Sequence, residues 1–129
     1  MTLPLLVVDA ANVVGSVPDG WWRDRAGAAA RLRDDLVDVA RHGLPSLPGP
    51  LEVVLVVEGR ARHVEPVPGV HVVPAAGSGD DAIVDVVRAN PPDRPCTVIT
   101  ADRALRARVE ALNATVLGPR TVRRPHGGR

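Results

Sequence analysis

Five short apolar runs recur along the chain, and they predict buried β-strands. The runs are rich in Val and continuous, without alternation of apolar and polar residues. Such runs are typical of strands in a parallel sheet that is covered on both faces. They occupy residues 5–8, 53–57, 70–73, 97–99 and 115–117. The pattern therefore predicts five strands of one parallel sheet.

Helical periodicity is found in the segments between these runs. An apolar stripe that includes Leu32 and Leu36 predicts a helix that ends near residues 42–43. Two shorter helices are expected after the third and fourth strands, at about residues 80–89 and 103–112. Residues 45–50 and 60–69 are rich in Pro and Gly and are expected to be loops.

The alternation of strands and helices predicts a single-domain, Rossmann-like α/β fold. Right-handed crossovers favour a doubly wound parallel sheet of five strands in the order 3-2-1-4-5, with helices on both faces. A chain of 129 residues has room for one such core. We expect residues 1–119 to form the domain and the Arg-rich residues 120–129 to form a flexible tail.

Composition excludes several classes of protein. All 16 basic residues are Arg, the formal net charge is +1, and Phe and Tyr are absent, so a base-stacking platform of Phe and Tyr is disfavoured. Cys96 is alone, which excludes a disulfide or thiolate zinc framework and suits a reducing compartment. The apolar start is too short for a signal peptide or membrane span, so we expect a cytoplasmic protein without a membrane partner.

Acidic residues follow the predicted strands. Asp9 ends the first strand, Glu58 ends the second, and Asp102 follows the fourth, whereas the third leads through a Gly-rich turn to Asp80 and Asp81. Because the carboxyl ends of parallel strands form one edge of a sheet, we expect these acids to lie close together.

Each acid also has a purely structural interpretation. Asp9 could form an Asx-turn, Asp102 could cap the next helix, and Glu58 could be solvated at a strand end. Ser78 and Asp81 fit a capping box, S-x-x-D. The clustering of all these acids at one edge favours a functional site.

Helical phase distinguishes the two neighbouring aspartates. Asp80 shares its helical stripe with Ile83 and Val87 and should point inward, whereas Asp81 aligns with the polar Asp85. Inward carboxylates at Asp80 and Asp102, facing Asp9, would repel one another unless cations neutralise them. Oxygen ligands without Cys or His favour Mg²⁺ or Mn²⁺.

The ordered motifs resemble the NYN branch of the PIN-like nucleases, and most of all its bacterial YacP-like members. They are V-V-D-A-A-N-V-V-G-S, D-G-W-W-R-D-R, V-V-E-G-R-A-R, G-S-G-D-D-A-I-V, T-A-D-R-A-L-R-A-R-V and V-L-G-P-R. The resemblance covers nearly the whole chain in the right order. It implies a PIN-like domain that hydrolyses RNA with a divalent metal. Two departures are Ala10 and Asn113, which stand where Gly is common in the family.

The resemblance assigns roles to particular residues. The family's acids match Asp9, Asp80 and Asp102, which would be catalytic and hold the metal, and Asp81 stands beside Asp80 as a further ligand. The family's Asn matches Asn12, which we expect to organise the turn after the first strand and, as an open alternative, to contact substrate.

Other residues near the acids have supporting interpretations. Glu58 is expected nearby, and Arg60, Arg62 and Arg103 would suit phosphate contact, with solvated surface charge as the alternative. Of Trp21 and Trp22, one would anchor the core and an exposed partner could stack on a base.

The leading hypothesis is a metal-dependent ribonuclease with Mg²⁺ or Mn²⁺ as cofactor and RNA as partner. One alternative is a hydrolase of nucleotides or other small phosphate esters. Another is a non-catalytic RNA-binding or regulatory domain that retains the acidic edge. The sequence leaves open whether the protein forms a homodimer.

Overall fold

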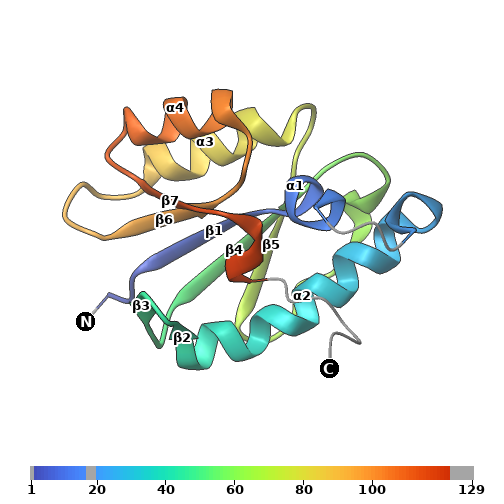
Figure 1. The fold of residues 1–129 in the computed structure, drawn as a ribbon, viewed down its shortest axis with the longest axis horizontal. Coiled ribbons are helices and arrows are strands. Elements are labelled where there is room, and N and C mark those ends of the chain that lie inside the picture. The colour runs from blue at the N-terminus through green and yellow to red at the C-terminus, as the bar shows by residue number, and fades with distance from the viewer. Residues whose placement is uncertain (1, 17–19, 123–129) are drawn as a thin grey trace.

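The computed structural model describes residues 2–16 and 20–122 and contains a five-stranded parallel sheet (Figure 1). The strands are β1 (Leu5–Asp9), β4 (Glu52–Val57), β5 (Val70–Pro74), β6 (Cys96–Ile99) and β7 (Thr115–Leu117). Their order across the sheet is β5-β4-β1-β6-β7, and every pair is parallel. The predicted α/β fold and the strand order 3-2-1-4-5 are therefore confirmed.

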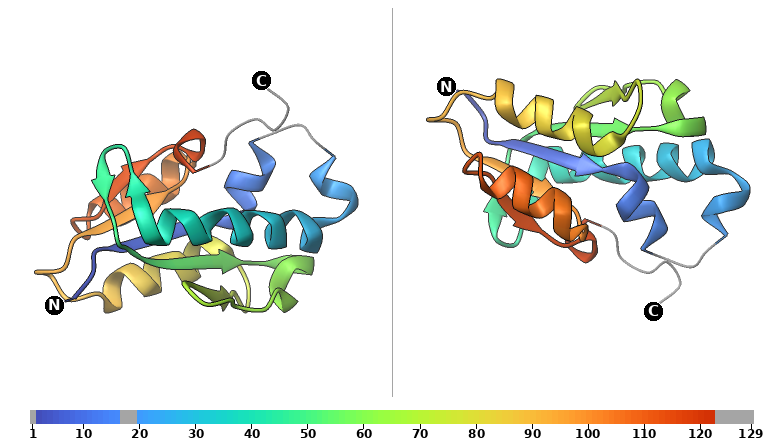
Figure 2. Two further views of the ribbon diagram at one scale, coloured as in Figure 1. Left: turned by 90° about the horizontal axis from the view of Figure 1, so that it is seen from below. Right: turned by 90° about the horizontal axis from the view of Figure 1, so that it is seen from above.

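Helices cover both faces of the sheet. They are α1 (Ala10–Gly15), α2 (Arg25–His42), α3 (Gly79–Ala89) and α4 (Arg103–Glu110). Figures 1 and 2 show α1 and α2 on one face and α3 and α4 on the other. Each helical layer packs on its own hydrophobic core, one with α1 and α2 and one with α3 and α4.

The central strand β1 divides its side chains between these two cores. Leu6 and Val8 belong to the core beneath α1 and α2, whereas Leu5 and Val7 belong to the core beneath α3 and α4. Because side chains alternate along a strand, Asp9 lies in phase with Leu5 and Val7. The first acid is thereby directed to the face that carries α3 and α4.

Three connections contain structure that the sequence did not predict. The turn after β1 forms the short helix α1, whose six residues are too few to show a helical period. The expected loop at residues 60–69 begins inside a 3₁₀ helix, η2 (Gly59–His63). The expected loop at residues 45–50 contains part of a small hairpin, β2 (Gly43–Leu44) with β3 (Leu47–Pro48).

The end of the described chain packs onto the domain. A 3₁₀ helix, η3, covers Pro119–Thr121, and Val122 is buried against the core beneath α1 and α2. The first residues of the expected tail at 120–129 therefore belong to the packed structure. Residues 123–129 lie outside the described residues, so the prediction of a flexible tail is not tested there. No helix in the described part of the chain is long and apolar enough to span a membrane.

Candidate functional site

Asp9 is a buried carboxylate at the carboxyl end of the central strand. It is 6% exposed, caps α1, and accepts a hydrogen bond from the Asn12 backbone N–H at 3.3 Å. The pKa of Asp9 is raised to about 6, chiefly by burial; the charges of Asp80 and Glu58 add to the rise, and its hydrogen bonds with Thr100 and Asn12 oppose it. The structural interpretation of Asp9 as a turn or cap residue therefore holds. The same carboxylate is also buried, which disfavours its charged form.

Thr100 links Asp9 to the acid that follows β6. Its hydroxyl donates to Asp9 Oδ2 at 3.0 Å and accepts from the Asp102 backbone N–H at 3.1 Å. Asp102 caps α4, with Oδ1 accepting from the Leu105 N–H at 2.9 Å. One buried hydroxyl therefore holds the two aspartates in a fixed relation. Sequence reasoning did not single out Thr100, although a Thr between a buried strand and the capping Asp was visible in V-I-T-A-D.

Asn12 lies in α1, directly after β1, and its side chain reaches the loop that follows β6. Its Oδ1 accepts a hydrogen bond from the Ala101 backbone N–H at 2.8 Å. The contact joins α1 to the loop between β6 and α4. The segment after β1 and the loop after β6 are therefore joined twice, once through Thr100 and once through Asn12.

Asp80 lies in the first turn of α3 and is half-buried, in agreement with the inward orientation predicted from helical phase. Ser78 caps the helix, because its hydroxyl accepts from the Asp80 backbone N–H at 3.1 Å. Burial is the largest cause that raises the pKa of Asp80. The negative charges of Asp102 and Glu58 raise this pKa as well, whereas the positive charge of Arg108 lowers it. Asp80 therefore feels charges from acids that follow two other strands.

Glu58 contacts the beginning of α3 from the adjacent strand end. Its carboxylate accepts a hydrogen bond from the Gly79 backbone N–H. A Cβ atom at position 79 would lie 2.8 Å from Glu58 Oε2, so glycine permits this close approach. The negative carboxylate also complements the positive end of the helix dipole. Glu58 is thus fixed in the acidic cluster and is not merely solvated.

We term four carboxylates the acidic edge: those of Asp9, Glu58, Asp80 and Asp102.

Asp81 is exposed, in contrast to Asp80. It forms an ion pair with Arg108, with 3.0 Å between Asp81 Oδ1 and Arg108 Nη1. The structure therefore gives Asp81 a structural partner on the outer face of α3. Its role as a metal ligand remains a prediction.

The arginines expected to contact phosphate are exposed. Arg60 and Arg62 lie in η2, directly after Glu58, and Arg103 begins α4, directly after Asp102. Arg62 donates to the Gly59 carbonyl at 3.2 Å. In the described part of the chain none of the three forms an ion pair with an acid. They flank the acidic edge and are available to an anion.

The donors of the acidic edge suit a hard divalent cation, since all are carboxylate oxygens under mutual repulsion. Within residues 2–16 and 20–122, however, no group of three or more His, Cys, Asp or Glu side chains is arranged to hold a metal ion. Several of the carboxylates are engaged with backbone N–H groups or Thr100. Mg²⁺ commonly keeps several waters and needs only one or two carboxylates, so the donor set fits with water-mediated ligation.

Comparison with known proteins gives a structural likeness alone. No family model matches the chain, and no curated protein matches it significantly. Among solved structures, Rae1 (YacP) from Bacillus subtilis superimposes with a TM-score of 0.74 and 16% identity over 92% of this chain and 71% of that one. A mutant of Rae1 gives a TM-score of 0.75 and 16% identity over 93% of this chain and 72% of that one. The chain therefore shares the fold of YacP, which is the fold that its resemblance to the YacP-like members of the NYN branch implied.

Proposed function

We propose that this protein is a divalent-metal-dependent ribonuclease that acts at the acidic edge. The observation that supports the proposal is electrostatic: the charges of Asp80 and Glu58 act on Asp9, and those of Asp102 and Glu58 act on Asp80. Burial and mutual repulsion raise the pKa values of Asp9 and Asp80 in this cluster. Clusters of carboxylates with perturbed pKa values are typical of catalytic sites. The YacP fold and the resemblance to PIN-like nucleases support RNA as the substrate.

Each residue has a role that follows from its position. Asp9, Asp80 and Asp102 would hold the cation, with Mg²⁺ or Mn²⁺ favoured by their oxygen donors. The cation, when bound, activates water and stabilises the leaving oxygen of an in-line displacement. Thr100 and Asn12 are positioning residues, because they fix the two loops that carry Asp9 and Asp102.

The arginines beside the acids would bind the RNA backbone. Arg60, Arg62 and Arg103 are exposed next to Glu58 and Asp102. Their positive charge would offset the repulsion between RNA phosphates and the acidic edge. The double variant Arg60→Ala, Arg62→Ala should therefore weaken RNA binding and reduce its dependence on salt, without altering the response to metal.

Cleavage of a synthetic RNA in Mn²⁺, Mg²⁺ or EDTA tests the proposal. We expect product with the metals, none in EDTA, and none with Asp9→Asn or Asp102→Asn. Binding of the RNA should persist in these variants, since each removes a negative charge that faces phosphate. Asp85→Asn is the matched control, because Asp85 is an exposed acid of α3 that pairs with Arg88. Cleavage that survives in both site variants would refute the proposal.

A non-catalytic RNA-binding domain is the second candidate. The observation in its favour is that, among the described residues, no three acids form a ready arrangement for a metal ion. RNA binding without product in any divalent metal would establish this alternative. Hydrolysis of nucleotides but not RNA, lost with the same Asp substitutions, would identify a small phosphate ester as the substrate instead.

A further inference from the structure

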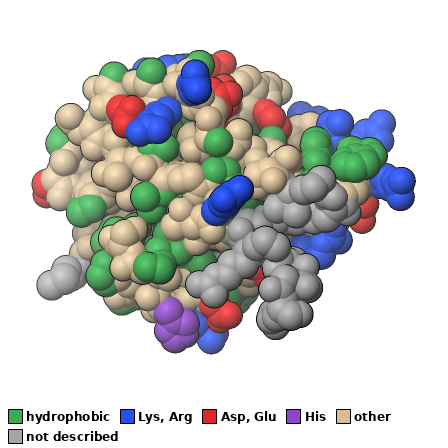
Figure 3. Space-filling view, viewed as in Figure 1, with side chains coloured by type: hydrophobic (Ala, Val, Ile, Leu, Met, Phe, Trp, Pro, Cys, Tyr) green, Lys and Arg blue, Asp and Glu red, His purple; other side chains and the backbone are tan. Residues whose placement is uncertain are grey.

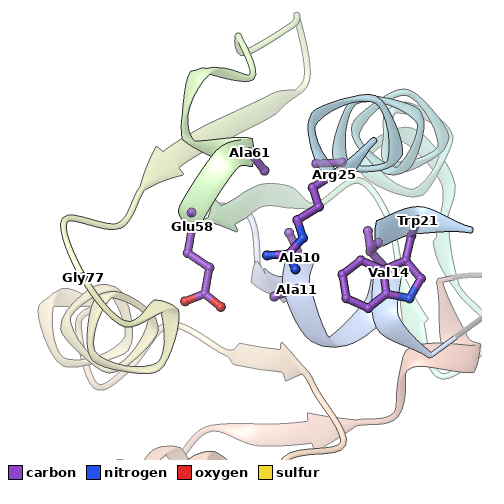
Figure 4. A pocket seen from close by; sticks show the side chains of 10 residues that line it. Ala10, Ala11, Val14, Trp21, Arg25, Glu58, Ala61 and Gly77 are labelled. Atoms are coloured by element: carbon purple, nitrogen blue, oxygen red, sulfur yellow. The ribbon is translucent and has the colours of Figure 1, made fainter. Parts of the chain in front are cut away.

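A cavity of about 410 Å³ opens beside the acidic edge. Its walls come from α1, α2, η2 and the short 3₁₀ helix η1 (Trp21–Arg23) (Figure 4). Much of the wall is Ala or Gly, including Ala11 and Ala61, so small side chains leave the space open. Glu58 belongs both to this wall and to the acidic edge. The cavity is therefore continuous with the proposed reaction site.

One aromatic ring, Trp21, and one cation, Arg25, line the far side of the cavity. The Arg25 guanidinium carbon lies 5.5 Å from the centroid of the Trp21 ring, within the range of a cation–π contact. Trp22 packs edge-on against Trp21, with ring centroids 6.2 Å apart. Figure 3 shows Arg side chains and exposed hydrophobic atoms together at the end of the molecule where α2 begins, and there Trp22 is 53% exposed. Trp21 thus holds the Arg25 guanidinium at this side of the cavity.

Arg25 extends into the cavity toward the side that carries Glu58 (Figure 4). Among the described residues they do not form an ion pair with each other. Glu58 accepts a hydrogen bond from the Gly79 N–H through Oε2 and also lines the cavity, so its carboxylate can accept a further hydrogen bond there. A ligand that fits between the two side chains should therefore accept hydrogen bonds on one side and donate them on the other.

We propose that this cavity binds one unpaired guanine base of the RNA substrate, an inference that rests on the proposed function. Guanine carries the acceptors O6 and N7 for Arg25 and an N2 amino donor for Glu58. The volume lies within the usual range of ligand sites. Because Glu58 is shared, a base held here places its phosphate beside the acidic edge.

Calorimetric titration of short RNAs in EDTA tests the inference without any cleavage. The probes are an oligouridylate with one internal guanosine and the same oligouridylate without it. We expect the guanosine to tighten binding about tenfold, the effect of one set of hydrogen bonds to a base edge. Arg25→Ala should abolish this tenfold difference. So should Ala11→Leu, which places a larger side chain in the cavity from an exposed position outside the core.

Arg41→Ala is the matched control, since Arg41 is exposed at the opposite end of α2 and carries the same charge. It should retain the full preference for guanosine. Equal binding of the two probes by the wild-type chain would overturn the inference, as would an unchanged preference in both Arg25→Ala and Ala11→Leu. Because the assay needs no metal, a guanosine preference that persists in a chain without nuclease activity would leave the inference standing and reject the proposed function alone.

Discussion

Asp9→Asn should gain stability relative to the wild type as pH rises toward neutrality, although it alters a buried residue. The folded state raises the pKa of Asp9 from 3.8 to about 6, chiefly by burial. Between these two values the folded chain binds more protons at Asp9 than the unfolded chain does, so its stability falls as pH rises. The contribution of Asp9 is fully present below about pH 4 and is lost as pH rises through about 6. An amide at this position does not titrate and escapes that loss.

The size of the effect follows from the same pKa values. A rise from 3.8 to about 6 corresponds to about 3 kcal/mol of unfolding free energy, at about 1.4 kcal/mol for each pH unit. The amide can keep the cap of α1, because Asn and Asp are equivalent at that position. Its amino group faces Thr100, whose hydroxyl can accept as well as donate. Any fixed cost of the amide is the same at all pH values and does not affect the slope.

Urea unfolding in EDTA, followed by far-ultraviolet circular dichroism, measures this effect. The stability of Asp9→Asn relative to wild type should increase by up to about 3 kcal/mol between about pH 4 and pH 8. Asp85→Asn changes an exposed carboxylate of α3 and should show a difference that stays within about 0.5 kcal/mol. A relative stability of Asp9→Asn that is flat with pH, or that falls as pH rises, would refute the reasoning.

Three further substitutions test other parts of the acidic edge. Asp80→Asn should keep or raise the melting temperature in EDTA, because it removes mutual repulsion, and should lose any rise that Mn²⁺ gives the wild type. Thr100→Val should destabilise the fold by about 2 kcal/mol in urea and raise the pKa of Asp9 further, because a buried hydrogen bond to a carboxylate is lost. Gly79→Ala should cost about 1 kcal/mol by displacing Glu58, and a Glu58→Ala background should remove that cost in a double-mutant cycle.

The sheet could be predicted from the sequence because its strands are buried on both faces. Their continuous apolar runs are typical of buried parallel strands and of few other elements. Right-handed crossovers then determine the order of the strands in the sheet. Helix α1 could not be predicted in this way. Its six residues give no measurable period, and Val13 and Val14 favour strands by propensity. The helix forms because Asp9 caps it and because both valines are buried against α2 and the sheet.

The acidic edge was predictable as a set of positions but not as a network. Strand ends and helical phase indicated Asp9, Asp80 and Asp102 as neighbours, and in the structure Asp80 interacts electrostatically with both of the others. The contacts through Thr100 join residues that are 91 positions apart, and the sequence contains no local signal for such a hydrogen bond. The cavity could not be predicted from the sequence either, because it is formed by small side chains on separate elements. Whether the acids bind a metal remains a prediction.

The Trp pair has a consequence for how this protein can be observed. With no Tyr or Phe in the chain, near-ultraviolet absorption and intrinsic fluorescence come from Trp21 and Trp22 in η1, just before α2. Those signals report on one wall of the cavity and not on the sheet. A thermal transition seen by fluorescence before the far-ultraviolet transition would therefore record local opening of that wall, at a lower free energy than global unfolding. The composition makes this protein a natural two-probe system, in which optical spectroscopy separates motion at the cavity from unfolding of the core.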